Sequence, residues 1–95
     1  MSAYLLVDIK ITDPTAYEEY RKQVPAILAA HGGKYLVRGG RTDLLEGEGM
    51  PNRTVVLEFP SMERLKAFYS SAEYEPLKRL RAAASRSRVV AVEGV

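Results

Sequence analysis

The residues best placed for chemistry are Asp8, Arg38 and Glu58, which strand alternation assigns to one face of a predicted sheet, on three neighbouring strands. An arginine between two carboxylates can be purely structural, because its guanidinium satisfies the carboxylate oxygens and fixes the strand register. The same arrangement can hold an acidic substrate, or leave one carboxylate free to act as a general base. Strand phase does not decide which carboxylate contacts Arg38, and Glu46 competes for it.

His31 is the only histidine, and therefore the only side chain whose ordinary pKa lies near neutrality. It stands just before Gly32, at the predicted end of a helix. This position favours a histidine that caps backbone carbonyls or lies half exposed, with catalysis as the alternative.

Tyrosine is frequent, and aromatic side chains at helical spacing usually form a core. Several phenols around one cavity would also suit a planar aromatic ligand. The candidate residues for such a pocket are Tyr17, Tyr20, Tyr35, Phe68, Tyr69 and Tyr74.

Composition narrows the classes of function. The chain has no cysteine, metal-ligand spacing, phosphate loop or nucleophile motif, so we expect neither a metal nor a cofactor, and a cytoplasmic location. No stretch approaches the roughly 18 to 20 apolar residues of a membrane span. A net charge of +2 is too weak to indicate nucleic acid. We interpret one late basic cluster as cations near the end of a helix: Lys78, Arg79, Arg81, Arg86 and Arg88.

The elements that must position these residues follow from periodicity. Strands are predicted at residues 5–11, 34–38, 54–59 and 89–93, with the second strand resuming at 42–46 beyond a kink at Gly39-Gly40. Asp13-Pro14 and Pro60-Ser61 begin helices, and a further helix runs to about residue 84. The order β-α-β-β-α-β predicts one α+β domain over residues 1–95, a ferredoxin-like fold with an antiparallel sheet in the order 4-1-3-2.

The two faces of this sheet differ in composition. Three apolar sets are predicted to lie beneath the helices: Leu5/Val7/Ile9/Ile11, Tyr35/Val37 and Val55/Leu57/Phe59. The other face shows Leu6, Leu36 and Val56 among charged residues, a surface too apolar to prefer water. We therefore expect a homodimer in which two such faces close into a barrel.

The chain also resembles a bacterial family known as domain of unknown function 1330, within the dimeric α+β barrel superfamily. The matching pieces span most of the sequence: Asp13-Pro14 with Tyr17 and Tyr20-Arg21, Gly33 to Gly40, Val56 to Ser61, Phe68-Tyr69 with Ser71 and Glu73-Tyr74, and Val92-Glu93-Gly94. The resemblance implies a homodimeric barrel of ferredoxin-like subunits. It implies no reaction, since the superfamily includes cofactor-free monooxygenases, muconolactone isomerase-like enzymes and haem-degrading proteins as well as binding and regulatory domains.

Two classes of function therefore remain open. The first is a cofactor-independent oxygenase or isomerase acting on a small organic substrate, such as an aromatic one, with Arg38, Glu58, Asp8 or His31 as polar groups and tyrosines as walls. The second is a non-catalytic dimeric module that binds a small ligand or only assembles. A deep pocket in which an ionisable group meets the aromatic side chains would favour the first class.

Overall fold

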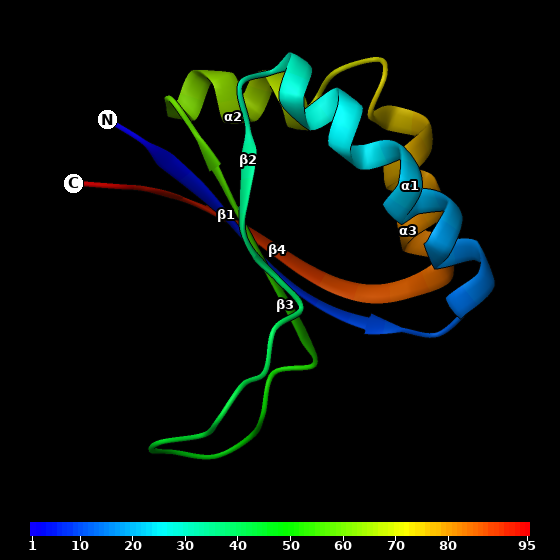
Figure 1. Ribbon diagram of the computed structural model, residues 1–95, viewed down its shortest axis with the longest axis vertical. Helices are drawn as coiled ribbons and strands as arrows, with labels where there is room; N and C mark the ends of the chain where they lie inside the picture. The colour runs from blue at the N-terminus through cyan, green and yellow to red at the C-terminus, as the bar shows by residue number, and fades with distance from the viewer.

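The computed structural model describes residues 1–95 and follows the predicted order of elements. These are β1 (Ala3–Ile11), α1 (Pro14–Ala30), β2 (Lys34–Arg38), β3 (Arg53–Phe59), α2 (Met62–Tyr69), α3 (Glu75–Ala84) and β4 (Ser85–Glu93). The strands form one antiparallel sheet in the order β2-β3-β1-β4. The predicted ferredoxin-like fold is confirmed, and the helices cover one face of the sheet (Figure 1).

The helices begin and end where local chemistry predicts. Asp13 caps α1 by accepting a hydrogen bond from the backbone N–H of Ala16 at 3.2 Å, and Pro14 occupies the first helical position. Ser61 caps α2 in the same way. Gly32 follows α1 with a φ of 76°, a backbone conformation that favours glycine.

The core lies between the sheet and the helices. On the sheet side it contains Ala3, Leu5, Val7, Ile9, Val55, Leu57 and Phe59, and on the helix side Tyr17, Tyr20, Val24, Leu28, Leu65, Phe68, Tyr74, Leu77 and Ala84. The predicted covered face is thus buried along β1 and β3. Ile11 and Tyr35 are partly buried and pack against this core.

A bulge in β2 reverses the predicted phase of that strand. Tyr35 pairs with Leu57, but Val37 pairs with Val56, so Leu36 is an extra residue in β2. A shift of one residue exchanges the two faces of a strand. Val37 is therefore on the uncovered face and Arg38, opposite Val55, is on the covered face. The predicted row of Asp8, Arg38 and Glu58 on a single face is wrong.

The segment between β2 and β3 is a long loop rather than a continued strand. Residues 39–52 contain no strand, so the predicted continuation at 42–46 is wrong. The loop projects from the body of the molecule (Figure 1) and carries the largely exposed side chains of Leu44, Leu45 and Met50. At the other end of the chain, β4 begins at Ser85, four residues earlier than predicted.

An apolar row crosses the uncovered face and takes one residue from each strand. Val37 pairs with Val56, Val56 with Leu6, and Leu6 with Val90, which makes a continuous row across the sheet. Leu6 is 42% exposed and Val90 43%.

None of the helices has the length and apolar content needed to cross a bilayer.

Candidate functional site

The interior contains a small cavity between the sheet and the helices α1 and α3. Its free volume is about 30 Å³, room for roughly two water molecules. The walls combine aliphatic side chains of β1 and β3 with polar and aromatic ones. The polar and aromatic lining residues are Tyr17, Tyr20, Arg21, Tyr35, Arg38, Arg53, Tyr74 and Arg81.

Arg81 of α3 is the buried cation of this cavity, with 6% of its surface exposed. Its Nη1 donates to the hydroxyl of Tyr74 at 2.9 Å, and its Nη2 lies 3.4 Å from the hydroxyl of Tyr69. Its Nε is buried and has no hydrogen-bond partner. Burial opposes the charge on Arg81, but the neighbouring phenol groups outweigh burial and raise its pKa, so the guanidinium remains protonated.

Two tyrosines extend this polar network along the wall. The hydroxyls of Tyr20 and Tyr74 are 2.7 Å apart, and the ring of Tyr17 lies 5.4 Å from that of Tyr20. Burial is the main cause of the raised pKa values of Tyr20 and Tyr74. Both phenols are therefore neutral at physiological pH and can donate as well as accept hydrogen bonds.

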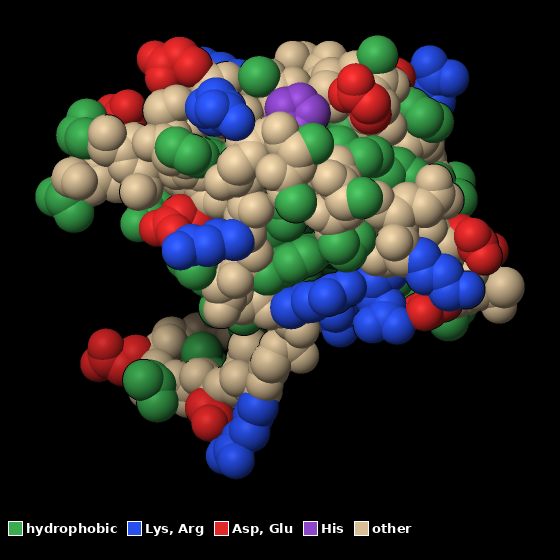
Figure 2. All heavy atoms as spheres, turned by 45° about the horizontal axis from the view of Figure 1, so that its top comes forward, with side chains coloured by type: hydrophobic (Ala, Val, Ile, Leu, Met, Phe, Trp, Pro, Cys, Tyr) green, Lys and Arg blue, Asp and Glu red, His purple; other side chains and the backbone are tan.

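Three more arginines surround the mouth of the cavity. Arg38 stacks on Tyr35, with its Cζ 4.5 Å from the ring centre. The Nη2 of Arg53 lies 3.5 Å from the backbone carbonyl oxygen of Arg38, and its Nε is buried without a partner. Arg21 forms an ion pair with Glu18 at 2.7 Å. Basic side chains gather beside hydrophobic ones on this side of the molecule (Figure 2).

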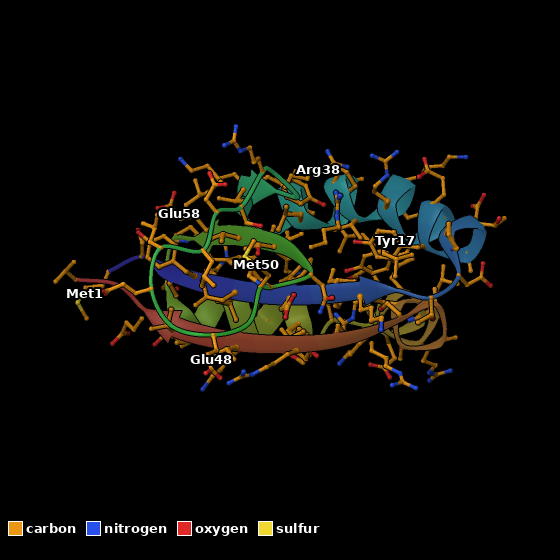
Figure 3. All side chains as sticks on the ribbon, turned by 90° about the horizontal axis from the view of Figure 1, so that it is seen from below. Met1, Tyr17, Arg38, Glu48, Met50 and Glu58 are labelled. Carbon is orange, nitrogen blue, oxygen red and sulfur yellow. The ribbon has the colours of Figure 1, made fainter.

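The two carboxylates predicted beside Arg38 lie on the opposite face of the sheet. Asp8 accepts a hydrogen bond from the backbone N–H of Asn52 at 2.8 Å, and Glu58 pairs with Lys34 at 3.2 Å. Figure 3 shows Arg38 beside α1, whereas Glu58 lies nearer the end of the sheet that carries Met1. Neither carboxylate lines the cavity.

The remaining predicted residues divide into lining and supporting groups. Of the six predicted aromatic residues, Tyr17, Tyr20, Tyr35 and Tyr74 line the cavity. Phe68 is fully buried against Tyr74 in the core, and Tyr69 lies behind the lining, where it contacts Arg81 and the ring of Tyr74. His31 is half-buried at the end of α1, with Nδ1 3.0 Å from the carbonyl oxygen of Ile27, and lies outside the cavity lining. Its predicted capping position is confirmed.

Sequence reasoning missed Arg53 and Arg81 as residues of the cavity, although both carry a periodic signal. Arg81 follows Leu77 by four positions on the buried face of α3. Arg53 alternates with Val55 on β3, which assigns both to the covered face. Sequence reasoning instead interpreted Arg81 as one of several cations near the end of a helix, and so did not assign it to the cavity.

The chemistry available here is hydrogen bonding and charge rather than metal coordination. No three His, Asp or Glu side chains are grouped to hold a metal ion. The guanidinium of Arg81 and the phenols of Tyr20 and Tyr74 would instead donate hydrogen bonds to an oxygen atom of a bound molecule. Such donors, fixed in a dry site, also stabilise negative charge that develops on oxygen during a reaction.

Known proteins share this architecture. The sequence model of the family described as "Domain of unknown function (DUF1330)" matches residues 2–95. No curated protein matches the sequence. Among solved structures, a protein of unknown function from Rhodopseudomonas palustris aligns with a TM-score of 0.78 and 19% identity, covering 99% of this chain and 82% of that one.

Two further solved structures resemble the chain at lower identity. SnoaB from Streptomyces nogalater, described as a cofactor-independent oxygenase, aligns with a TM-score of 0.68 and 14% identity, covering 99% of this chain and 93% of that one. A dimeric ferredoxin-like protein of unknown function from Jannaschia sp. CCS1 aligns with a TM-score of 0.67 and 17% identity, covering 99% and 100%. At these identities the likeness shows the fold alone.

Proposed function

The chain belongs to the DUF1330 family, and we propose that it binds a small organic molecule in the cavity between the sheet and the helices α1 and α3. The observation that carries this proposal is a void at which a buried arginine meets a wall of four tyrosines. Apolar walls with a few converging polar groups are typical of small-molecule sites. A protein that only assembled would gain stability by filling this void with aliphatic side chains.

The free volume of about 30 Å³ is smaller than an aromatic ring, so the mouth must open to admit such a ligand. Arg38 is the part best able to move, because it is exposed and rests on the ring of Tyr35. Arg53 is tied to the backbone of β2 by one long contact of 3.5 Å. Movement of these two side chains would enlarge the cavity and leave the backbone pairing of the sheet in place.

We propose that the protein works as a homodimer joined through the uncovered face. The apolar row of Leu6, Val37, Val56 and Val90 has no helix above it. A stable interface there should bury on the order of 1,500 Å² in total. The protein from Jannaschia, described as dimeric and ferredoxin-like, supports a dimer of this fold.

The catalytic form of the proposal is a cofactor-independent oxygenase or isomerase. Its support is the phenol and guanidinium network of Tyr20, Tyr74 and Arg81, which suits an enolate or phenolate oxygen. SnoaB, of the same fold, is described as such an oxygenase. The alternative is a non-catalytic dimeric module, and the small free volume favours it. Turnover of a bound ligand without added metal or cofactor would distinguish the enzyme from the module.

The test of ligand binding is a methyl NMR titration with benzoate, benzamide, phenol and catechol. Val24, Val55 and Leu57 report on the cavity, whereas Val90 and Val92 on the uncovered face serve as controls. We expect at least one probe to shift the cavity methyls to saturation while the controls stay unchanged. If no probe shifts the cavity methyls at millimolar concentration, or if only the control methyls respond, the proposed site is wrong.

A further inference from the structure

Three of the four arginines that line the cavity have no carboxylate partner. Arg38, Arg53 and Arg81 take part in none of the ion pairs of the structure, and no Asp or Glu lines the cavity. Arg21 alone has an acidic partner, Glu18, and the hydrogen bond from Arg21 lowers the pKa of the Glu18 carboxyl. The lining therefore carries an excess of positive charge within the protein itself.

Such an arrangement is costly for a protein without a ligand. Removing a guanidinium from water carries a penalty that is repaid only by an opposite charge or by complete hydrogen bonding. Arg81 has neither, since its partners are neutral phenols and its Nε is unpaired. Arg53 repeats the pattern with a second buried, unpaired Nε at the mouth of the same cavity. A purely structural role would be served better by an apolar side chain of similar length.

The geometry points to a small aromatic carboxylate as the ligand of this cavity, an inference that rests on the proposed binding function. The carboxylate would lie against the guanidinium of Arg81, which offers planar paired donors that match its two oxygens. The aromatic ring would lie between Tyr17, Tyr20 and Tyr35, where the walls are aromatic and aliphatic. Arg38 and Arg53 would close over the ligand and complete the neutralisation of charge.

The hydroxyls of Tyr20 and Tyr74 would recognise a second polar group of the ligand, an oxygen atom on the ring. Tyr20 and Tyr74 are neutral phenols with hydroxyls 2.7 Å apart, so the hydroxyl of Tyr20 can turn to an additional oxygen on the ring while Tyr74 keeps its bond to Arg81. An ortho-hydroxyl carboxylate offers such an oxygen beside the carboxylate. Salicylate should therefore bind more tightly than benzoate.

The test compares each acid with its neutral amide, salicylate with salicylamide and benzoate with benzamide, by the same methyl NMR titration. A charge-assisted hydrogen bond is roughly twice as strong as a neutral one, so we expect each acid to bind about tenfold more tightly than its amide. Inorganic phosphate is added in a separate titration. Saturation of the cavity by phosphate at the same concentration would show that the site selects charge without the ring, and would overturn the aromatic part of the inference.

Arginine variants identify which cation causes the preference for the acid over the amide. Arg81→Met should abolish the preference for the acid, and Arg38→Met should weaken acid binding severalfold in a protein that folds normally, because Arg38 is exposed. Arg79→Met is the matched control, since Arg79 lies on the same helix with a side chain that is 78% exposed. The expected result is that this control leaves both affinities unchanged.

Each outcome separates the inference from the function on which it rests. Equal binding of acid and amide at the cavity methyls would overturn the anionic ligand but keep the proposed small-molecule site. Failure of all four compounds to reach the cavity would contradict both. An equal loss of acid binding in Arg79→Met and Arg38→Met would assign the preference to overall charge, and would overturn the role of the cavity arginines. If Arg81→Met does not fold, the affinities for acid and amide are compared in Arg38→Met instead.

Discussion

Gly39 and Gly40 are adjacent, but the structure predicts opposite effects when each is replaced by alanine. Gly39 has a φ of 71°, whereas Gly40 is not among the residues with positive φ. A Cβ on Gly39 would also collide with the guanidinium of Arg53, whereas a Cβ on Gly40 would meet nothing within 4 Å. The left-handed region costs a residue with a Cβ about 1–2 kcal/mol. Gly39→Ala should therefore destabilise the protein and Gly40→Ala should not.

The magnitude follows from two opposing effects. Replacing glycine by alanine restricts the unfolded chain and stabilises the protein by about 0.4–1 kcal/mol where the native backbone tolerates alanine. For Gly40→Ala this increase in stability is the only effect that we expect. Gly39→Ala loses more than it gains, and we expect a net loss of about 1 kcal/mol. In a domain of this size that loss lowers the melting temperature by roughly 4–8 °C.

The assay is chemical denaturation at one fixed protein concentration, repeated in an Arg53→Ala background. Arg53 is long and can swing away, so the backbone should be the main source of the cost. The loss caused by Gly39→Ala should therefore persist when the guanidinium is absent. Disappearance of the loss in that background would assign it to the collision instead. Equal stability of the two single glycine variants would refute the argument from φ.

Three other predictions follow from the network and the uncovered face. Tyr20→Phe removes one of the two hydroxyls that lie 2.7 Å apart and should lower the free energy of unfolding by about 1 kcal/mol, whereas Tyr4→Phe, whose hydroxyl has no hydrogen bond, should leave it unchanged in urea denaturation. Burial raises the pKa values of Tyr20 and Tyr74, so the folded state holds these protons more tightly than the unfolded state. Stability should then fall as the pH rises above about 10, with a shallower slope in Tyr20→Phe, and a flat profile by circular dichroism would contradict this. Leu6→Lys introduces a charge into the apolar row and should convert a dimer into a monomer by light scattering; a wild-type monomer would remove the dimer proposal.

The order of elements was predictable because each boundary has its own local chemistry. Asp13 with Pro14, and Ser61, are capping residues whose side chains make the expected bonds. Gly32 takes the left-handed conformation that ends a helix. Alternation along β1 and β3 identified the buried face, because both strands keep a constant phase.

The phase of β2 was not predictable from alternation, because one inserted residue leaves no compositional trace. An apolar residue such as Leu36 fits both a regular strand and a bulged one. The bulge at Leu36 nevertheless moves Arg38 from the uncovered to the covered face. The glycine pair drew attention to a kink at residues 39–40, three residues beyond the irregularity. The wrong prediction that Asp8, Arg38 and Glu58 share one face therefore came from the register of β2.

The charge of the cavity was hidden for a different reason. An arginine on a buried helix face is an exception to the general rule that cations are exposed, and sequence reasoning assigned Arg81 to a basic cluster near the end of a helix and not to the cavity. The rule fails where a site needs charge, and such failures are expected at functional positions. The periodicity of α3, which aligns Arg81 with Leu77, was the better guide.

The most direct test of the anionic ligand site is the NMR resonance of the Arg81 Nε–H group during titration with salicylate. This Nε is buried and has no hydrogen-bond partner in the structure, so its proton resonance should move strongly when a carboxylate reaches it. We expect a saturable downfield shift with salicylate and none with salicylamide, while the exposed Arg79 shows no change. An Arg81 resonance that stays fixed while salicylate saturates elsewhere on the protein would contradict the central claim.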